Sequence, residues 1–147
     1  MIDTNLWISR LLMPGGQAAK AVDHGLAWGL PLMSEDTLTE LVDVLARPKF
    51  DRYVSLADRQ QFIRLLGGIV RVIPITQRIT ACRDPKDDKF LDIALNGDAR
   101  MILTGDNDLL ELHPFHGIEI LKPADFLNRP SGLTPLPLYF SNPAFLT

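Results

Sequence analysis

Apolar side chains recur every three or four positions in several stretches of the chain, as in amphipathic helices. The clearest stretch follows Ser34, a residue that favours the N-cap position, and ends before Pro48. Its apolar stripe, spaced i, i+3, i+4 and i+7, consists of Leu38, Leu41, Val42 and Leu45. This spacing predicts a helix between the serine and the proline.

Other segments predict further helices separated by short strands. We expect helices over 15–30, 56–69 and 84–98, the last stopping near Gly97. The apolar segments at 30–34, 70–75, 100–106 and 117–121 favour strands. Alternating helices and strands are typical of an α/β fold with a mostly parallel sheet. We expect one domain over 1–128 and a proline-rich extended arm over 129–147, because closely spaced prolines break helix and sheet.

Composition narrows the class of protein. With 147 residues, 46% of them hydrophobic, the chain suits one globular domain with a real core. No apolar run approaches the roughly 20 residues that span a bilayer, and no secretory signal pattern stands at the start, so we expect no membrane and a cytoplasmic location. The single cysteine, Cys82, excludes an internal disulfide. A net charge of -3 provides no overall basic field for nucleic acid.

Three acids crowd into residues 84–88, at the start of a predicted helix. Asp84 precedes Pro85, which is a common N-cap arrangement, and Asp87 at the third position favours the helix dipole. Helix-start chemistry therefore explains both. Asp88 lies one helical turn beyond Asp84 on the same face, and starting the helix does not require it. It is a candidate for function if other acids converge on it, and otherwise a solvated surface acid.

Two further acids directly follow predicted strands. Asp3 follows the first apolar residues, and Asp106 follows the apolar run of 101–104 closely. Carboxyl ends of parallel strands open on one edge of a sheet, where ligands bind. We expect Asp3 and Asp106 to meet there and Asp88 to lie near the same edge. Aspartate is also common in ordinary turns after strands.

Four segments, IDTNLWIS, LTELVDVLARPKF, CRDPKDDKFLDIAL and ILTGDNDLL, resemble in order the signature segments of PIN-domain proteins. They look closest to the VapC-like branch described as toxins of toxin–antitoxin systems, and the resemblance covers roughly residues 1–127. It implies a Rossmann-like, three-layer α/β/α domain with a mostly parallel central sheet. It also implies a carboxylate cluster that binds Mg²⁺ or Mn²⁺ and hydrolyses RNA phosphodiester bonds. The implied partners are an RNA substrate and a cognate antitoxin protein.

Matched segment by segment, the resemblance implies a set of site residues, and hard divalent cations prefer such oxygen ligands. The expected catalytic and metal-binding residues are Asp3, Glu40, Asp88 and Asp106, with Glu40 as a ligand or as the residue that orients the attacking water. The expected auxiliary residues are Asn5, Asp84, Thr104 and Asp108. Glu40 is singled out by the resemblance alone, since periodicity places it opposite the apolar stripe, where any solvated glutamate would lie.

A basic rim is expected around an acidic centre that must accept RNA, and phosphate contacts commonly come from lysine and arginine. The candidates are Arg10, Arg47, Lys49 and Arg52. The principal alternative is a catalytically weak or inactive PIN-like domain that binds RNA or protein. A phosphatase of the haloacid-dehalogenase type is disfavoured, because residues 3–7 read Asp-Thr-Asn-Leu-Trp and lack its second aspartate.

Two features depart from, or lie beyond, the resemblance. Only Met1 and Ile2 precede Asp3, so either the true start lies upstream or the first strand is short, and in the second case Asp3 would be positioned loosely. The tail beyond Arg129 carries apolar residues that suit packing on a second protomer, as in a homodimer, or on a partner, or folding back on its own domain. These are Leu136, Leu138, Tyr139 and Phe140.

Overall fold

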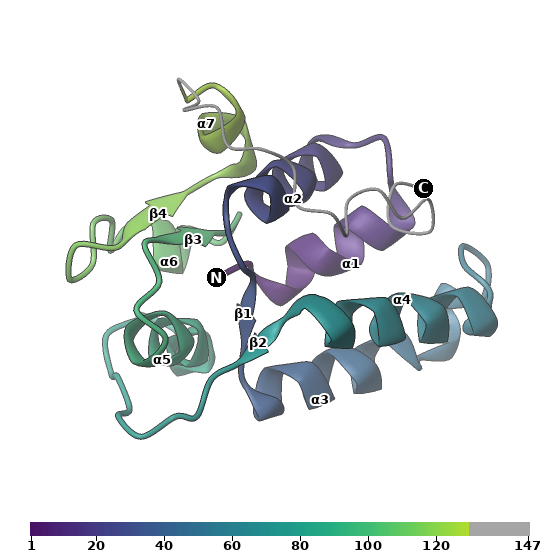
Figure 1. The fold of residues 1–147 in the computed structure, drawn as a ribbon, viewed down its shortest axis with the longest axis horizontal. Coiled ribbons are helices and arrows are strands. Elements are labelled where there is room, and N and C mark those ends of the chain that lie inside the picture. The colour runs from purple at the N-terminus through teal and green to yellow at the C-terminus, as the bar shows by residue number, and fades with distance from the viewer. Residues whose placement is uncertain (130–147) are drawn as a thin grey trace.

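The computed structural model describes residues 1–129, and the arm expected over 129–147 lies, except for its first residue, outside the described residues. Helices and short strands follow one another along the chain (Figure 1). The first half contains α1 (Thr4–Leu12), α2 (Gln17–Trp28), β1 (Leu32–Met33), α3 (Glu35–Leu45), the 3₁₀ turn η1 (Pro48–Phe50) and α4 (Leu56–Ile69). The second half contains β2 (Arg71–Val72), the 3₁₀ turn η2 (Pro85–Asp87), α5 (Asp88–Asn96), β3 (Met101–Leu103), α6 (Asn107–Leu110), β4 (Glu119–Leu121) and α7 (Pro123–Leu127).

The strands are short and parallel. β1 pairs with β2, β3 pairs with β4, and Ile2 adds an isolated parallel bridge to Leu103. The prediction of a mixed α/β fold with parallel strands is confirmed. The strands are two or three residues long, shorter than predicted, and among residues 1–129 they form two separate two-stranded sheets. Successive strands run parallel because a helix or a long loop returns the chain between them.

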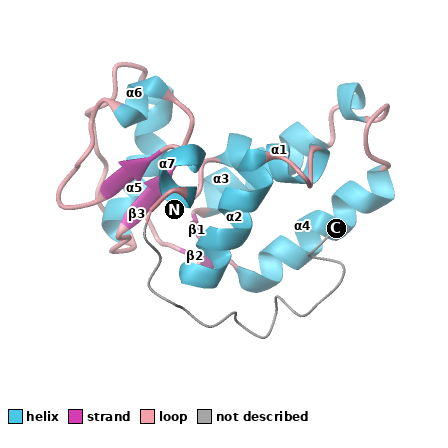
Figure 2. Ribbon diagram, turned by 90° about the horizontal axis from the view of Figure 1, so that it is seen from above, coloured by secondary structure: helices cyan, strands magenta, loops and turns pink. Residues whose placement is uncertain are grey.

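Alternate residues of the strands face two different hydrophobic cores. In β3, Met101 and Leu103 enter the core formed mainly by α1 to α4, whereas Ile102 enters the core that contains the apolar face of α5. β1 divides in the same way, with Met33 in the first core and Leu32 in the second. Figure 2 shows α5 on one side of β3 and helices α1 and α2 on the other. The strands therefore lie between two helical layers.

Local sequence rules explain several helix boundaries. The Ser34 side chain accepts a hydrogen bond from the Thr37 amide at 3.1 Å and forms a capping box with it, as the N-cap prediction requires. In the stripe of α3, Leu41 and Leu45 are fully buried and Leu38 is partly buried, but Val42 is 38% exposed. The helical period of 3.6 residues carries Val42 to the edge of the buried face. Helices α1, α6 and α7 were not predicted.

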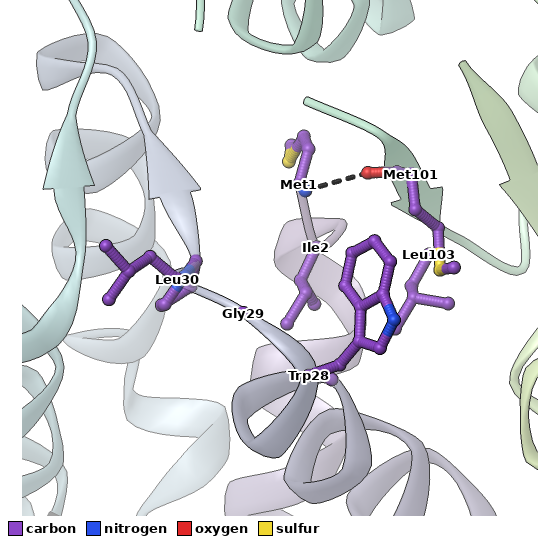
Figure 3. A pocket seen from close by; sticks show the side chains of 9 residues that line it. Met1, Ile2, Trp28, Gly29, Leu30, Met101 and Leu103 are labelled. Atoms are coloured by element: carbon purple, nitrogen blue, oxygen red, sulfur yellow. Dashed lines mark hydrogen bonds between the residues drawn. The ribbon is translucent and has the colours of Figure 1, made fainter. Parts of the chain in front are cut away.

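The first strand holds Asp3 more firmly than expected. The Asp3 amide donates to the Leu103 carbonyl at 2.9 Å, and the Leu103 amide donates to the Met1 carbonyl at the same distance. The Met1 amino group adds a 2.9 Å hydrogen bond to the Met101 carbonyl (Figure 3). These hydrogen bonds fix the segment before Asp3 against β3, so the short first strand does not leave Asp3 loosely positioned.

A small apolar pocket of about 40 Å³ lies beside these same residues, near the amino ends of the strands (Figure 3). Its lining includes Ile2, Trp28, Leu30 and Leu103, and it contains no ionisable side chain. Apart from the buried Met1 amino group, it offers no group for acid–base or metal chemistry. No helix within the described part of the chain is long and apolar enough to cross a membrane.

Candidate metal centre

Asp3 is a buried carboxylate held from both sides. It is 3% exposed, caps α1 through a 3.0 Å hydrogen bond from the Asn5 amide, and accepts a 2.7 Å hydrogen bond from the Thr104 hydroxyl. Burial raises the pKa of Asp3, and the nearby Asp106 raises it further, whereas these hydrogen bonds and Lys89 oppose the rise. Asp3 is therefore a fixed carboxylate whose negative charge lacks full compensation.

Thr104 joins Asp3 to the segment after β3. Its hydroxyl donates to Asp3 and accepts from the Asp106 amide at 3.0 Å. Asp106 then caps α6 by accepting from the Asp108 amide at 2.9 Å. The buried Thr104 hydroxyl thus links Asp3 to Asp106. Both acids lie at the same edge of the sheet, as expected after the carboxyl ends of parallel strands.

Asp87, in the 3₁₀ turn η2, lies near Asp3 and Asp106. Burial, a hydrogen bond shared with Asp106 and the charges of Asp106, Asp84 and Asp3 raise the pKa of Asp87 to about 7. Its side chain makes no capping hydrogen bond, although helix-start chemistry alone was expected to explain it. Carboxylate oxygens of Asp84, Asp87 and Asp108 lie within 4.8 Å of one another. These three residues can together hold a metal ion.

Asp88 makes its hydrogen bonds to the loop before η2. It is 8% exposed, and one of its oxygens accepts hydrogen bonds from the Cys82 amide at 2.7 Å and the Ala81 amide at 3.1 Å. Burial alone would raise the pKa of Asp88, but the amide hydrogen bonds outweigh burial and lower it. Asp88 therefore fastens the loop before η2, and its expected role as a metal ligand stays a prediction; the carboxylate that the structure groups with Asp84 and Asp108 is that of Asp87.

Glu40 lies at the side of the site, on α3. Its Oε2 atom is 2.5 Å from the Lys89 ammonium, which extends from the first turn of α5. Lys89 also lowers the pKa of Asp3 through its charge. Glu40 is thus linked to the acids through Lys89, and no carboxylate of the described residues hydrogen-bonds to it directly.

The expected basic rim is only partly accessible. Arg10 is 3% exposed and its guanidinium pairs with Asp23 at 2.9 Å, so its assignment to RNA binding is corrected. Arg47, Lys49 and Arg52 are exposed around η1, at the end of α3. They remain candidates for phosphate contacts.

Comparison with known proteins decides the family. A family model described as a PIN domain matches residues 1–108. The chain belongs to the PIN domain family. An uncharacterized protein of Methanocaldococcus jannaschii is 30% identical over 116 residues, which cover 76% of this chain and 73% of that protein. No solved structure matches.

Membership gives the acidic cluster a chemical context. PIN domains have a Rossmann-like α/β/α fold and are typically metal-dependent nucleases. The donors in this PIN domain fit a hard divalent cation, because all of them are carboxylate oxygens. A cation would also neutralise the charges that raise the pKa of Asp87. The resemblance to the toxin branch stays a prediction, since the one relative named is uncharacterized.

One sequence signal could have placed the Asp87 carboxylate beside that of Asp84. Pro85 follows the cap residue Asp84, and a proline at this position begins a tight first turn. In a 3₁₀ turn residues three apart are eclipsed, so the carboxylate that accompanies Asp84 is the one three positions later. The i, i+4 rule of the α-helix pointed to Asp88 instead.

Proposed function

We propose that this PIN domain is an endoribonuclease that depends on Mg²⁺ or Mn²⁺ and acts as the toxin of a toxin–antitoxin pair. The observation that carries the proposal is the convergence of acids from three distant segments. Asp3, Asp87 and Asp106 interact electrostatically with one another, and Asp84 and Asp108 lie beside them. So many carboxylates in one place are unfavourable without a cation, and structural needs do not account for Asp87.

Asp3, Asp87 and Asp106 are the proposed metal ligands, with Asp84 and Asp108 as additional oxygen donors. A divalent ion held by these residues would activate water as a nucleophile at neutral pH and stabilise charge on a phosphate. Thr104 orients Asp3, and the Ala81 and Cys82 amides orient Asp88, which in turn fixes the start of α5. Glu40 is the proposed residue that orients the attacking water.

RNA is the proposed substrate, and Arg47, Lys49 and Arg52 are the proposed phosphate contacts. They lie on η1 and its flanks, beyond the end of the helix that carries Glu40. The toxin role, a cognate antitoxin, a homodimer and a cytoplasmic location come from the sequence resemblance and composition. Growth arrest on expression of the chain, relieved by co-expression of the protein encoded beside it, tests the toxin role.

The nuclease proposal is tested with purified protein and a fluorescent single-stranded RNA. We expect cleavage with Mn²⁺ and none with EDTA. Asp3→Asn, Asp87→Asn and Asp106→Asn should each reduce the rate at least about a hundredfold, because each removes a charged ligand. Asp43→Asn on the exposed surface of α3 is the matched charge control and should cleave like the parent.

Several outcomes would contradict the proposal. Absence of Mn²⁺-dependent cleavage by the parent protein excludes the nuclease. Equal cleavage by the parent and Asp106→Asn excludes the assigned centre. Binding of RNA without cleavage would support the alternative, a PIN domain that serves as a binding module.

A further inference from the structure

Lys89 connects the two helices that flank the acidic cluster. It lies in the first turn of α5, and its ammonium is 2.5 Å from the Glu40 carboxylate of α3. The two residues are 49 positions apart, so only the fold brings them together. Their side chains are 32% and 42% exposed, respectively. The pair therefore lies at the rim of the site, where solvent and substrate can reach it.

The charge of Lys89 acts beyond Glu40. Five aspartates form the cluster and its surroundings, and Glu40 adds a sixth carboxylate: Asp3, Asp84, Asp87, Asp106, Asp108 and Glu40. Among residues 1–129, Lys89 is the only basic side chain with a recorded ion pair to any of these six. It also interacts electrostatically with Asp3.

Stability alone gives a weak reason for this pair. Ion pairs between partly exposed side chains contribute little to the free energy of unfolding, because solvent screens them and two long side chains lose freedom. The charge of a lysine beside a metal site affects cation binding more than it affects folding, because it repels the ion that the carboxylates attract. The position of Lys89 therefore matters more for what the site binds than for folding.

We infer that Lys89 is a positioning residue that holds Glu40 beside the cluster, outside the set of direct metal ligands, and weakens the affinity of the cluster for a divalent cation. This inference rests on the proposed metal-dependent function. It assigns Glu40 to the orientation of water. The opposite charges of Lys89 and Glu40 then cancel in their effect on a bound cation, whereas Lys89 alone would repel the cation and Glu40 alone would attract it.

Mn²⁺ binding measured by isothermal titration calorimetry tests the inference without any RNA. Lys89→Met should bind Mn²⁺ about tenfold more tightly, because a positive charge near the ion is removed. Glu40→Gln should bind about tenfold more weakly, because Lys89 is then uncompensated. The double variant Lys89→Met/Glu40→Gln should return to within about threefold of the parent, and Lys89→Arg should also stay there.

The matched control is Lys86→Met. Lys86 is exposed in η2, carries the same charge and has no recorded ion pair among the described residues. It should show at most a small part of the tightening. Unchanged or weaker Mn²⁺ binding by Lys89→Met overturns the inference, because a purely structural role could only loosen the site. A double variant that binds more than tenfold more weakly than the parent also overturns it, because Glu40 would then be a direct ligand.

The two proposals fail in different ways. If the parent binds Mn²⁺ but does not cleave RNA, the nuclease proposal fails and the affinities still decide the role of Lys89. If the parent does not bind Mn²⁺, both proposals fail. Thermal unfolding of each variant without metal checks that it folds, and Lys89→Arg provides a second variant should Lys89→Met not fold.

Discussion

Two adjacent aspartates at the start of α5 should respond in opposite ways to the same substitution. Asp87 lies against Asp106 and near Asp84 and Asp3, whereas Asp88 accepts hydrogen bonds from two backbone amides. In the absence of divalent metal, Asp87→Asn should increase the free energy of unfolding and Asp88→Asn should decrease it. Each substitution changes the side chain by one atom and one charge, so the difference reports environment.

The sign for Asp87 follows from its raised pKa. Burial and the neighbouring carboxylates raise the pKa from 3.8 to about 7, so the folded state holds this proton more tightly than the unfolded state does. Stability is therefore lost as the pH rises from about 4 to about 7, and asparagine removes that loss. Allowing for solvent screening around a partly exposed carboxyl, we expect a gain of about 1–2 kcal/mol at pH 8 and a smaller one at pH 4.5.

The sign for Asp88 is the reverse. Its pKa is lowered, because the amide hydrogen bonds outweigh burial, so its ionised form stabilises the protein above the ordinary aspartate pKa, and this contribution disappears in acid. Asparagine keeps an acceptor oxygen but loses the charge that strengthens both hydrogen bonds. We expect a loss of about 1–2 kcal/mol at pH 8.

Urea unfolding at pH 8 and pH 4.5, with EDTA and followed by the fluorescence of the buried Trp7, measures both effects. The exposed Asp43→Asn is the control and should change stability by less than about 0.5 kcal/mol. The reasoning is refuted if Asp87→Asn destabilises the protein at pH 8. Equal effects of Asp87→Asn and Asp88→Asn would show that the two side chains share one environment.

Three further predictions follow from other parts of the fold. Arg59→Met should lower the free energy of unfolding in urea by about 2–4 kcal/mol, since the buried guanidinium donates to two carbonyls at the end of α3 and pairs with Asp51. Arg64 is exposed, so the control Arg64→Met should lower it by less than about 0.5 kcal/mol. Gly97→Ala should lower the free energy of unfolding by about 1–3 kcal/mol in the same assay, because a Cβ there would lie 2.7 Å from a leucine side chain of β1 and 2.9 Å from a backbone oxygen. As the control, a Cβ at Gly68 in α4 meets nothing within 4 Å, so Gly68→Ala should raise the free energy of unfolding by up to about 1 kcal/mol. Millimolar Mn²⁺ should raise the melting temperature of the parent and not that of Asp106→Asn in a thermal-shift assay, and an equal rise in both would place the ion elsewhere.

Hydrophobic periodicity predicted the elements whose apolar residues form an uninterrupted pattern. The helices over Glu35–Leu45, Leu56–Ile69 and Asp88–Asn96 and the four short strands all fall within predicted segments. Helix α1 was missed because its buried face includes Arg10, whose charge is compensated by Asp23 from α2. A buried ion pair between helices looks polar in the sequence, so periodicity cannot detect it.

The candidate site was predictable where strand ends position the residue. Asp3 and Asp106 follow residues that pair in parallel, so their meeting follows from sheet geometry. Glu40 and Arg10 depend on side-chain partners from other helices, Lys89 and Asp23. Such partners are set by tertiary packing, which the sequence does not display, and both roles had to be read from the structure.

The different environments of Asp87 and Asp88 have a purely local cause. Between Pro85 and Asp87 the chain forms a 3₁₀ turn, in which the Asp87 amide donates to the Asp84 carbonyl at 3.0 Å. Residues three apart then share a face, and the next residue turns about 120° away, toward the amides of Ala81 and Cys82. Asp87 therefore remains with the acids, and Asp88 stabilises the loop that presents them. A continuous α-helix from Asp84 would have reversed these roles, so the opposite stability effects of the two asparagine variants also test whether this turn exists in solution.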